Sequence, residues 1–137
     1  MTRLLKTGDG YVFEFKKLTE NVAVFLAPVN IGLIFDNVSA KVFVVDTGNS
    51  EDYAKKIIKK VDQLNIEVAG IINTHAHEDH IGGNNCLQRR TNCRIYATRF
   101  ESFFIEEPML MAMCLYGAMP FDELSKKLNQ PKNSHVT

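Results

Sequence analysis

The sequence has no excess of charge of either sign and no apolar run long enough for a membrane. Its 16 Lys and Arg residues balance 16 Asp and Glu residues, so the formal net charge at pH 7 is zero. Without a global field, nothing in the composition attracts nucleic acid or an anionic membrane surface. The apolar runs stop well short of the roughly 20 residues that a membrane-spanning helix needs. We therefore expect neither a nucleic-acid partner nor a membrane partner, and function must come from a local site.

The sequence also lacks a signal-peptide pattern and a cysteine framework. Residues 1–6 carry charge, with no apolar segment behind them. Cys86, Cys93 and Cys114 cannot all pair within one chain, and there is no CxxC motif. The cysteine pattern thus predicts neither a thiolate zinc site nor a redox dithiol. Reduced thiols in a cytoplasmic protein are the simplest interpretation.

Repeats, low-complexity tracts and Pro/Gly-rich linkers are missing as well. A chain of 137 residues suffices for one compact domain and not for two, so we predict a single domain over residues 1–137. Its first third is typical of β structure. Short runs with strand character lie at 11–15, 22–26, 31–35 and 41–45. Their close spacing predicts a meander or a mixed sheet.

The pattern changes to a helical period at Ser50, a plausible N-cap followed by two acidic residues that suit the positive end of a helix. Apolar residues from Ala54 to Leu64 then share one helical face. A buried strand at 66–73 completes a βαβ unit with a parallel pair of strands. Asp46 and Thr74 would both follow strand C-terminal ends, at the edge where open α/β sheets bind ligands.

The rest of the chain is predicted as a short helix at 87–90, a strand at 94–97 and a helical region at 99–128. Pro108 and Pro120 interrupt that helical region, and residues 129–137 carry no clear element.

The chemistry is concentrated in residues 75–80, His-Ala-His-Glu-Asp-His, which hold three of the four histidines. Histidines two positions apart point the same way if the backbone is extended, and a turn at 78–79 would direct Asp79 and His80 to an adjacent point. Imidazole and carboxylate donors suit zinc, manganese or iron. Solvated loop histidines are the alternative, but four potential ligands in six residues favour a metal site, with two open ligand pairs suggesting two metals.

Residues 74–83 resemble the HxHxDH signature of the metallo-β-lactamase-fold hydrolases, and residues 43–48 match the strand-Asp-Thr-Gly element that precedes it in that family. The resemblance extends from about Ile31 to Ala97. It implies an α/β (α+β) fold: the N-terminal half of an αββα sandwich, with a mixed sheet and a βαβ unit leading to the metal loop.

The resemblance also implies roles for individual residues. His75 and His77 would bind a first zinc, and Asp79 and His80 a second, with iron or manganese as other options. A metal-bound hydroxide would be the nucleophile, and Asp79 would also orient it or receive its proton. Asp46 would hydrogen-bond a ligating imidazole; its alternative is a turn or capping role. Glu78, at a variable position, is expected to be solvated.

The match is incomplete beyond the motif. The family's second half supplies a further His, a bridging carboxylate and a last His. His135 lacks the flanking glycines of the family's third His, so we expect a solvated tail residue. Asp122 and Glu123, at an expected helix start, do not stand out as a bridging carboxylate. We expect a truncated domain; a naturally shortened product or a half-domain that pairs with another chain are the alternatives.

The segment 100–121 is rich in Phe, Met, Leu and Tyr. It fits ordinary helix packing, a substrate-facing wall of adaptable methionines, or an interface for a homo-oligomer.

We therefore expect a metal-dependent hydrolase that attacks an ester, thioester, amide or phosphodiester of a small-molecule substrate, with a site incomplete in this chain. Thioesterases of the glyoxalase II type, lactonases, β-lactamases and nucleases share the motif. The alternatives are a non-catalytic metal-binding or oligomerisation half-domain and an iron enzyme of oxygen chemistry.

Overall fold

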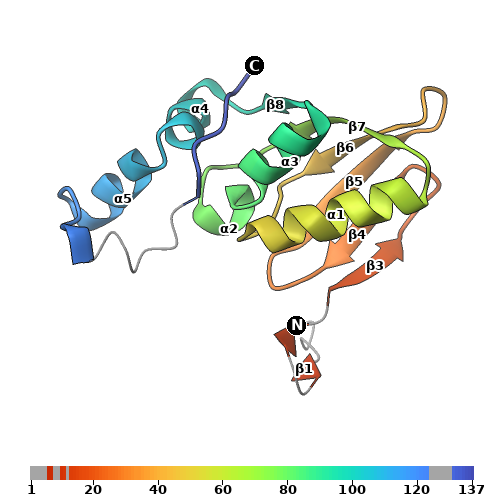
Figure 1. Ribbon diagram of the computed structural model, residues 1–137, viewed down its shortest axis with the longest axis horizontal. Helices are drawn as coiled ribbons and strands as arrows, with labels where there is room; N and C mark the ends of the chain where they lie inside the picture. The colour runs from red at the N-terminus through yellow and green to blue at the C-terminus, as the bar shows by residue number, and fades with distance from the viewer. Residues whose placement is uncertain (1–5, 8–9, 12, 124–130) are drawn as a thin grey trace.

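A computed structural model describes residues 6–7, 10–11, 13–123 and 131–137. Its main feature is a sheet of six strands in the order β3-β4-β5-β6-β7-β8 (Figure 1). These strands are β3 (Glu14–Lys17), β4 (Val22–Leu26), β5 (Ile31–Asp36), β6 (Lys41–Val45), β7 (Glu67–Ile72) and β8 (Arg94–Tyr96). A separate antiparallel pair is formed by β1 (Lys6–Thr7) and β2 (Gly10–Tyr11).

The sheet is mixed, as the strand spacing predicts. Strands β3 to β6 are antiparallel neighbours, whereas β6–β7 and β7–β8 are parallel pairs. The prediction of one strand over 11–15 was wrong, because β2 ends at Tyr11 and β3 begins at Glu14. The chain changes partner there: β2 pairs with β1, while Phe15 pairs with Phe25 of β4 and their rings stack edge to face.

The long crossover helix α1 (Glu51–Gln63) connects the two parallel strands β6 and β7, so the predicted βαβ unit is confirmed. It buries Ala54, Ile57 and Val61 on one face, which is the amphipathic pattern seen in the sequence. Ser50 occupies the N-cap position with extended backbone, although its side chain makes no capping hydrogen bond.

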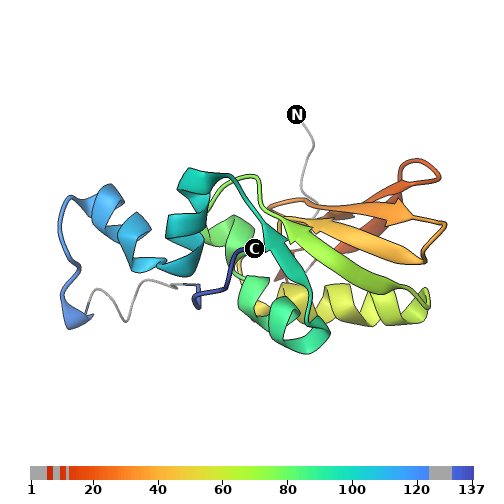
Figure 2. The same ribbon diagram turned by 90° about the horizontal axis from the view of Figure 1, so that it is seen from above.

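Helix α3 (Asn84–Thr91) is longer than predicted and lies beside α1 on the same face of the sheet (Figure 2). The main core lies between these helices and the sheet and includes Leu33, Val44, Ile71 and Leu87, all fully buried. On the other face of the sheet the alternate side chains are only partly covered; Ile34, for example, is 43% exposed.

Two further helices, α4 (Arg99–Glu106) and α5 (Met109–Tyr116), follow β8 and extend away from the sheet (Figure 1). The break between them at Pro108 agrees with the sequence. Residues 122–123 have helical backbone, and residues 124–128 of the predicted helical region are outside the described residues. No helix in the described part of the chain is long and apolar enough to cross a membrane.

The C-terminal segment 131–137 has no regular secondary structure, as predicted, but it is docked onto the domain. Thr137 donates from its backbone to the carbonyl of Ile95 at 2.8 Å, and Ser134 donates to the carbonyl of Ile105 at 3.3 Å. Ser134 is buried, and Val136 packs against both apolar clusters. The segment therefore lies along the sheet edge and α4 instead of forming a free tail.

Candidate metal centre

The site begins where the parallel strands β6 and β7 end. Asp46 follows β6 and Thr74 follows β7, and the backbone N–H of Thr74 donates to Oδ1 of Asp46 at 2.9 Å. The two residues thus meet at one edge of the sheet, as the βαβ geometry predicts. Asp46 is only 4% exposed and has a φ of 59°, a left-handed conformation that Asp tolerates better than most residues.

The carboxylate of Asp46 is fully engaged. Its Oδ2 accepts from Thr74 Oγ1 at 2.7 Å and lies 2.8 Å from His80 Nδ1, while Oδ1 also accepts from Asn73 Nδ2 at 3.4 Å. Because a carboxylate only accepts hydrogen bonds, Nδ1 of His80 must be the protonated ring nitrogen. The lone pair of Nε2 is then left available for a ligand.

The same logic applies to His75. Thr74 donates its single hydroxyl proton to Asp46, so its oxygen must accept from His75 Nδ1, which lies 3.0 Å away. His75 therefore also carries its proton on Nδ1 and keeps the Nε2 lone pair free. Asp46 thus fixes the tautomers of two imidazoles, one directly and one through Thr74.

The predicted site residues are brought together on this loop. The ring centroids of His75 and His80 are 3.9 Å apart, and those of His75 and His77 are 4.7 Å apart. Asp79 Oδ2 lies 4.0 Å from His80 Nε2. A short helix, α2 (Glu78–Ile81), stands where the sequence predicted a turn, with His77 at its N-cap. Glu78 is exposed, as expected.

The chemical types of the donors fit a zinc-type metal, because three imidazoles and one carboxylate lie close together on the same loop. In arrangement it is partial: in the described part of the chain, no three His, Cys, Asp or Glu side chains are grouped closely enough to hold an ion together. The residues therefore form two partial ligand sets. To hold an ion, the side chains of each set would have to move closer together or be joined by further donors.

Behind the motif lies a buried polar network that the sequence analysis missed. Asn84 Nδ2 donates to Asn73 Oδ1 at 2.7 Å, and Thr47 Oγ1 donates to Asn84 Oδ1 at 2.8 Å. All three residues are at most 3% exposed. In the sequence these polar residues directly follow buried strands or the Gly82-Gly83 pair. Polar side chains in such buried positions need hydrogen-bond partners, which could have indicated the network.

Glu101 is a second residue that the sequence analysis missed. Its Oε2 accepts from the backbone N–H of Ala76 at 2.6 Å, which ties the motif loop to α4. Thr98 caps α4 by accepting from the N–H of Glu101. The Thr-x-x-Glu spacing at a helix start could have indicated both residues, although here the glutamate reaches across to the loop.

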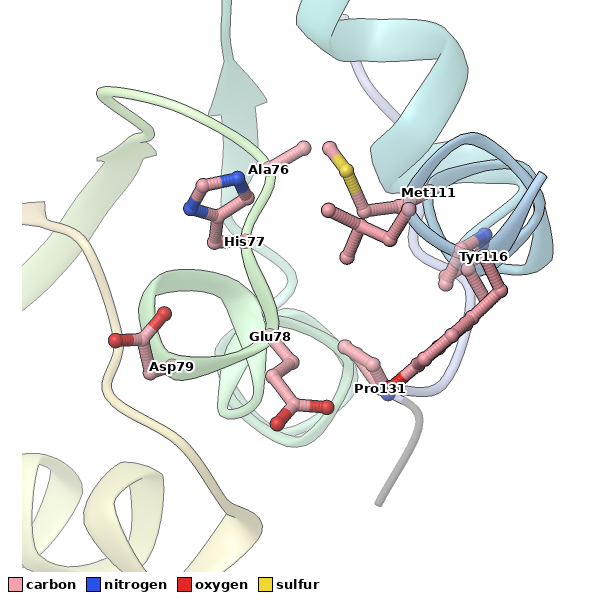
Figure 3. Close-up of a pocket in the computed structure, with 10 residues that line it drawn as sticks. Ala76, His77, Glu78, Asp79, Met111, Tyr116 and Pro131 are labelled. Atoms are coloured by element: carbon pink, nitrogen blue, oxygen red, sulfur yellow. The ribbon is translucent and has the colours of Figure 1, made fainter. Parts of the chain in front are cut away.

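A cavity of about 380 Å³ opens beside the motif. Figure 3 shows His77 and Asp79 on one side of it and Met111 and Tyr116 of α5 on the other. Part of the apolar segment 100–121 therefore forms a wall next to the site. Other residues of that segment have different surroundings: Ile105 is buried, and Phe100 is 77% exposed.

The remaining candidates lie elsewhere. The ring of His135 is exposed, with Nδ1 at 3.2 Å from Oε1 of Glu106, and its backbone is held by the amide of Gln88. Asp122 and Glu123 are exposed. All three cysteines are free, with Cys86 and Cys93 buried and Cys114 exposed.

Curated proteins similar to this chain include hydroxyacylglutathione hydrolases. One from Trichormus variabilis is 29% identical over 62% of this chain and 24% of its own length. Another from Pelagibacter ubique is 38% identical over 55% of this chain and 30% of its own length. This chain therefore spans about a quarter to a third of the length of these relatives.

A solved structure, the subclass B3 metallo-β-lactamase of Bradyrhizobium japonicum, superposes with a TM-score of 0.68 over 90% of this chain and 44% of that chain. At 20% identity this likeness concerns the fold alone. The mixed sheet with its βαβ unit is thus the metallo-β-lactamase fold that the motif predicts. The family model of the metallo-beta-lactamase superfamily matches residues 24–113, from the second strand of the sheet to α5. More than half of the sequence lies within that match, and the chain belongs to the metallo-β-lactamase superfamily.

Proposed function

We propose that this chain carries the N-terminal part of a metal-dependent hydrolase site for a small-molecule substrate. The observation that supports it most strongly is the single carboxylate of Asp46, which sets the tautomers of His75 and His80 so that both present Nε2. A solvated loop would have no need of a buried, four-fold accepting carboxylate in a left-handed backbone conformation.

In this proposal His75 and His77 would hold one ion, and Asp79 and His80 a second. Zinc suits these donors, and iron or manganese would also fit. When bound, such ions acidify water and polarise a carbonyl oxygen, which is the chemistry of hydrolysis at neutral pH. Asp79 has a further role as the proton acceptor or orienting group, because its carboxylate is half exposed beside His80.

The surrounding residues hold the ligands in place. Asp46 and Thr74 orient two imidazoles, and Glu101 fixes the backbone between His75 and His77 through the N–H of Ala76. Such partners raise the basicity of ligating imidazoles and keep their rings oriented. The named activity of the relatives, hydrolysis of an acyl group carried on glutathione, supports an acyl substrate.

One observation favours a second candidate, a non-catalytic metal-binding half-domain. No group of three donor side chains is placed to hold an ion in the described residues, and the chain spans only 24% of one relative's length. Zinc is normally held by three or four protein ligands, so a site with two pairs would bind weakly. This candidate keeps the same residues but predicts no turnover.

Metal stoichiometry separates the two candidates. The purified chain should be loaded with zinc, freed of excess ion and measured by elemental analysis alongside its oligomeric mass. His77→Ala removes an expected ligand, whereas His135→Ala removes an exposed histidine that pairs with Glu106. We expect His77→Ala to lower the metal content and His135→Ala to leave it unchanged.

Nearly two retained ions per chain, together with hydrolysis of a simple ester or thioester, would support the hydrolase. Retained metal without turnover would support the non-catalytic candidate. Equal losses in the two variants would contradict the ligand assignment.

A further inference from the structure

Segment 131–137 is held by α3 through its backbone. Gln88 contacts both backbone groups of His135: its Nε2 donates to the carbonyl at 2.8 Å, and its Oε1 accepts from the N–H at 3.1 Å. Asn85, one turn earlier in the same helix, donates to the carbonyl of Asn133 at 2.7 Å. Because a side-chain amide offers both a donor and an acceptor, Gln88 fixes His135 relative to α3 without using the imidazole ring.

The other side of the segment is held by α4 and β8. The N–H of Val136 donates to Oε1 of Glu106, in the last turn of α4, at 3.1 Å. The N–H of Thr137 donates to the carbonyl of Ile95 in β8 at 2.8 Å. Figures 1 and 2 show the segment passing between α4 and α3. It therefore joins α4 to the body of the domain that α3 and the sheet form.

The side chain of Val136 connects this segment to the metal loop, residues 74–81. It packs against an apolar cluster of Ala76, Ile81 and Ile105, which are at most 2% exposed. Two members of that cluster belong to the metal loop: Ala76 stands between the first two expected ligands, and Ile81 follows the last. Segment 131–137 thus covers the apolar support on which the ligand-bearing backbone rests.

Helix α4 provides a second connection between the segment and the metal loop. Glu101, in its first turn, accepts from the N–H of Ala76 at 2.6 Å. Ile105 and Glu106, in its last turn, accept hydrogen bonds from the segment. Because a short helix moves as one rigid element, holding its last turn also holds Glu101 against the loop.

We propose that segment 131–137 positions the metal loop, with Val136 as the positioning residue and α3 as the anchor. The role in metal binding rests on the proposed hydrolase function, whereas the coupling between segment and loop needs no metal. A docked segment keeps the backbone between the first two ligands in the conformation that carries the bond from Ala76 to Glu101. The coupling is reciprocal, so a metal loop ordered by zinc favours the docked segment by the same factor.

Amide hydrogen exchange on the full, metal-free chain tests the coupling without a metal. The readout is the N–H of Ala76, which exchanges when its bond to Glu101 opens. The N–H of Leu33, in the inner strand β5, reports global unfolding. Val136→Ala removes two methyl groups that pack against the cluster of Ala76. We expect it to speed exchange at Ala76 by about five- to tenfold relative to Leu33.

A matched control separates this effect from a general loss of stability. Val68 is also a partly buried valine that packs against the main core cluster, but it is not among the residues that pack against the cluster of Ala76. Val68→Ala removes the same two methyl groups from the chain. We expect it to change exchange at Ala76 and Leu33 by the same factor.

A second pair of variants loosens the segment at its anchor, away from the metal loop. Gln88→Ala removes both hydrogen bonds to His135 and leaves a good helix former in α3. We expect exchange at Ala76 to speed up by about threefold or more. Arg90→Ala, at an exposed position of the same helix, should leave the Ala76 amide unchanged.

The reciprocal effect is measured on the unchanged chain with zinc alone as the probe. Saturating zinc should slow exchange of the Val136 and Thr137 amides, although their acceptors, in Glu106 and Ile95, lie outside the motif. His77→Ala under the same zinc concentration should lose this protection, because it removes an expected ligand.

Equal changes at Ala76 in Val136→Ala and Val68→Ala would overturn the proposal, because the segment would then only add stability. Zinc binding that leaves exchange in segment 131–137 unchanged would also overturn it. The Gln88 and Arg90 pair decides the first question even if Val136→Ala fails to fold. A coupled Ala76 amide in a chain that retains no zinc would sustain the coupling and contradict the hydrolase function instead.

Discussion

Nδ1 of His80 lies 2.8 Å from Oδ2 of Asp46, and the two residues are 34 positions apart in the sequence. The contact joins the end of β6 to the metal loop after β7, so it depends on the parallel pairing of those strands. The fold and the chemistry are therefore linked through one carboxylate. Changes at Asp46 should act on metal affinity first, because the carboxylate decides which nitrogen of His80 remains unprotonated.

Asp46→Asn tests this link. Asparagine accepts a left-handed backbone nearly as well as aspartate, so the fold should be retained. Its amide nitrogen cannot accept from His80, and we expect zinc affinity to fall by about 10- to 100-fold. Competition with a chromogenic chelator measures the change. Asp62→Asn, at an exposed position on α1, is the control. An equal loss of zinc affinity in both variants would mean that Asp46 does not support the metal loop specifically.

Gly82 is expected to be intolerant of any side chain. A Cβ at this position would lie 2.3 Å from the carbonyl carbon of Asn49, a backbone atom that cannot move aside. The glycine lets the start of α3 pass directly over the loop that follows β6. We expect Gly82→Ala to lower the free energy of unfolding by about 3 kcal/mol or more, as overpacking against backbone does.

Urea denaturation measures this loss. Gly117→Ala is the comparison, because no atom lies within 4 Å of a Cβ there and only the φ of 71° opposes the change. That variant should lose about 1 kcal/mol. A Gly82→Ala protein as stable as the unchanged chain would contradict the close approach of the two segments.

Asn84 is expected to stabilise the site through its buried amide. Asn84→Ala leaves the side-chain oxygen of Asn73 and the hydroxyl of Thr47 without their closest partner. The buried oxygen of Asn73 is then unsatisfied, which costs about 1–3 kcal/mol, whereas the Thr47 hydroxyl keeps a longer bond to the carbonyl of His80 at 3.3 Å, so the free energy of unfolding should fall by about 1–3 kcal/mol. Asn85→Ala, which loses one exposed bond to the carbonyl of Asn133, should cost under about 1 kcal/mol. Denaturation curves measure both variants. Equal losses in the free energy of unfolding would contradict the buried hydrogen-bond network of Asn84.

The sequence was sufficient to predict the βαβ unit and the edge where Asp46 meets Thr74. These follow from local periodicity and from the direction of parallel strands, which leave few alternatives. The bounds of β4 and β6 also agree, because each is a short apolar run stopped by a turn. The prediction was wrong at 11–15, where the pairing partner changes and no local pattern records the change.

The contacts that the supporting residues of the site make were not predictable from spacing, even where a capping pattern could have singled out a residue such as Glu101. Asn73, Asn84 and Glu101 act through contacts between segments that only the fold brings together. A lone asparagine after a strand resembles a turn residue until its burial is known. The docking of residues 131–137 was also missed, because its backbone hydrogen bonds depend on the positions of Ile95 and Ile105 and not on its own composition.

The three thiols are expected to differ in reactivity. Burial raises the pKa of the Cys93 thiol, so that thiol stays protonated to a higher pH than an ordinary cysteine. Cys86 is only 2% exposed, whereas Cys114 lies on the surface of α5. Iodoacetamide at pH 7.5 should therefore alkylate Cys114 first in the folded chain, as peptide mass analysis would record. Labelling of Cys93 should need a higher pH than labelling of an ordinary cysteine, because only the thiolate reacts. Cys114→Ser should nearly abolish labelling of the folded chain, and denaturation should restore it at the other two positions. Prompt alkylation of Cys93 in the folded Cys114→Ser chain would mean that β8 and its core contacts open readily, which would contradict the packing described for this edge.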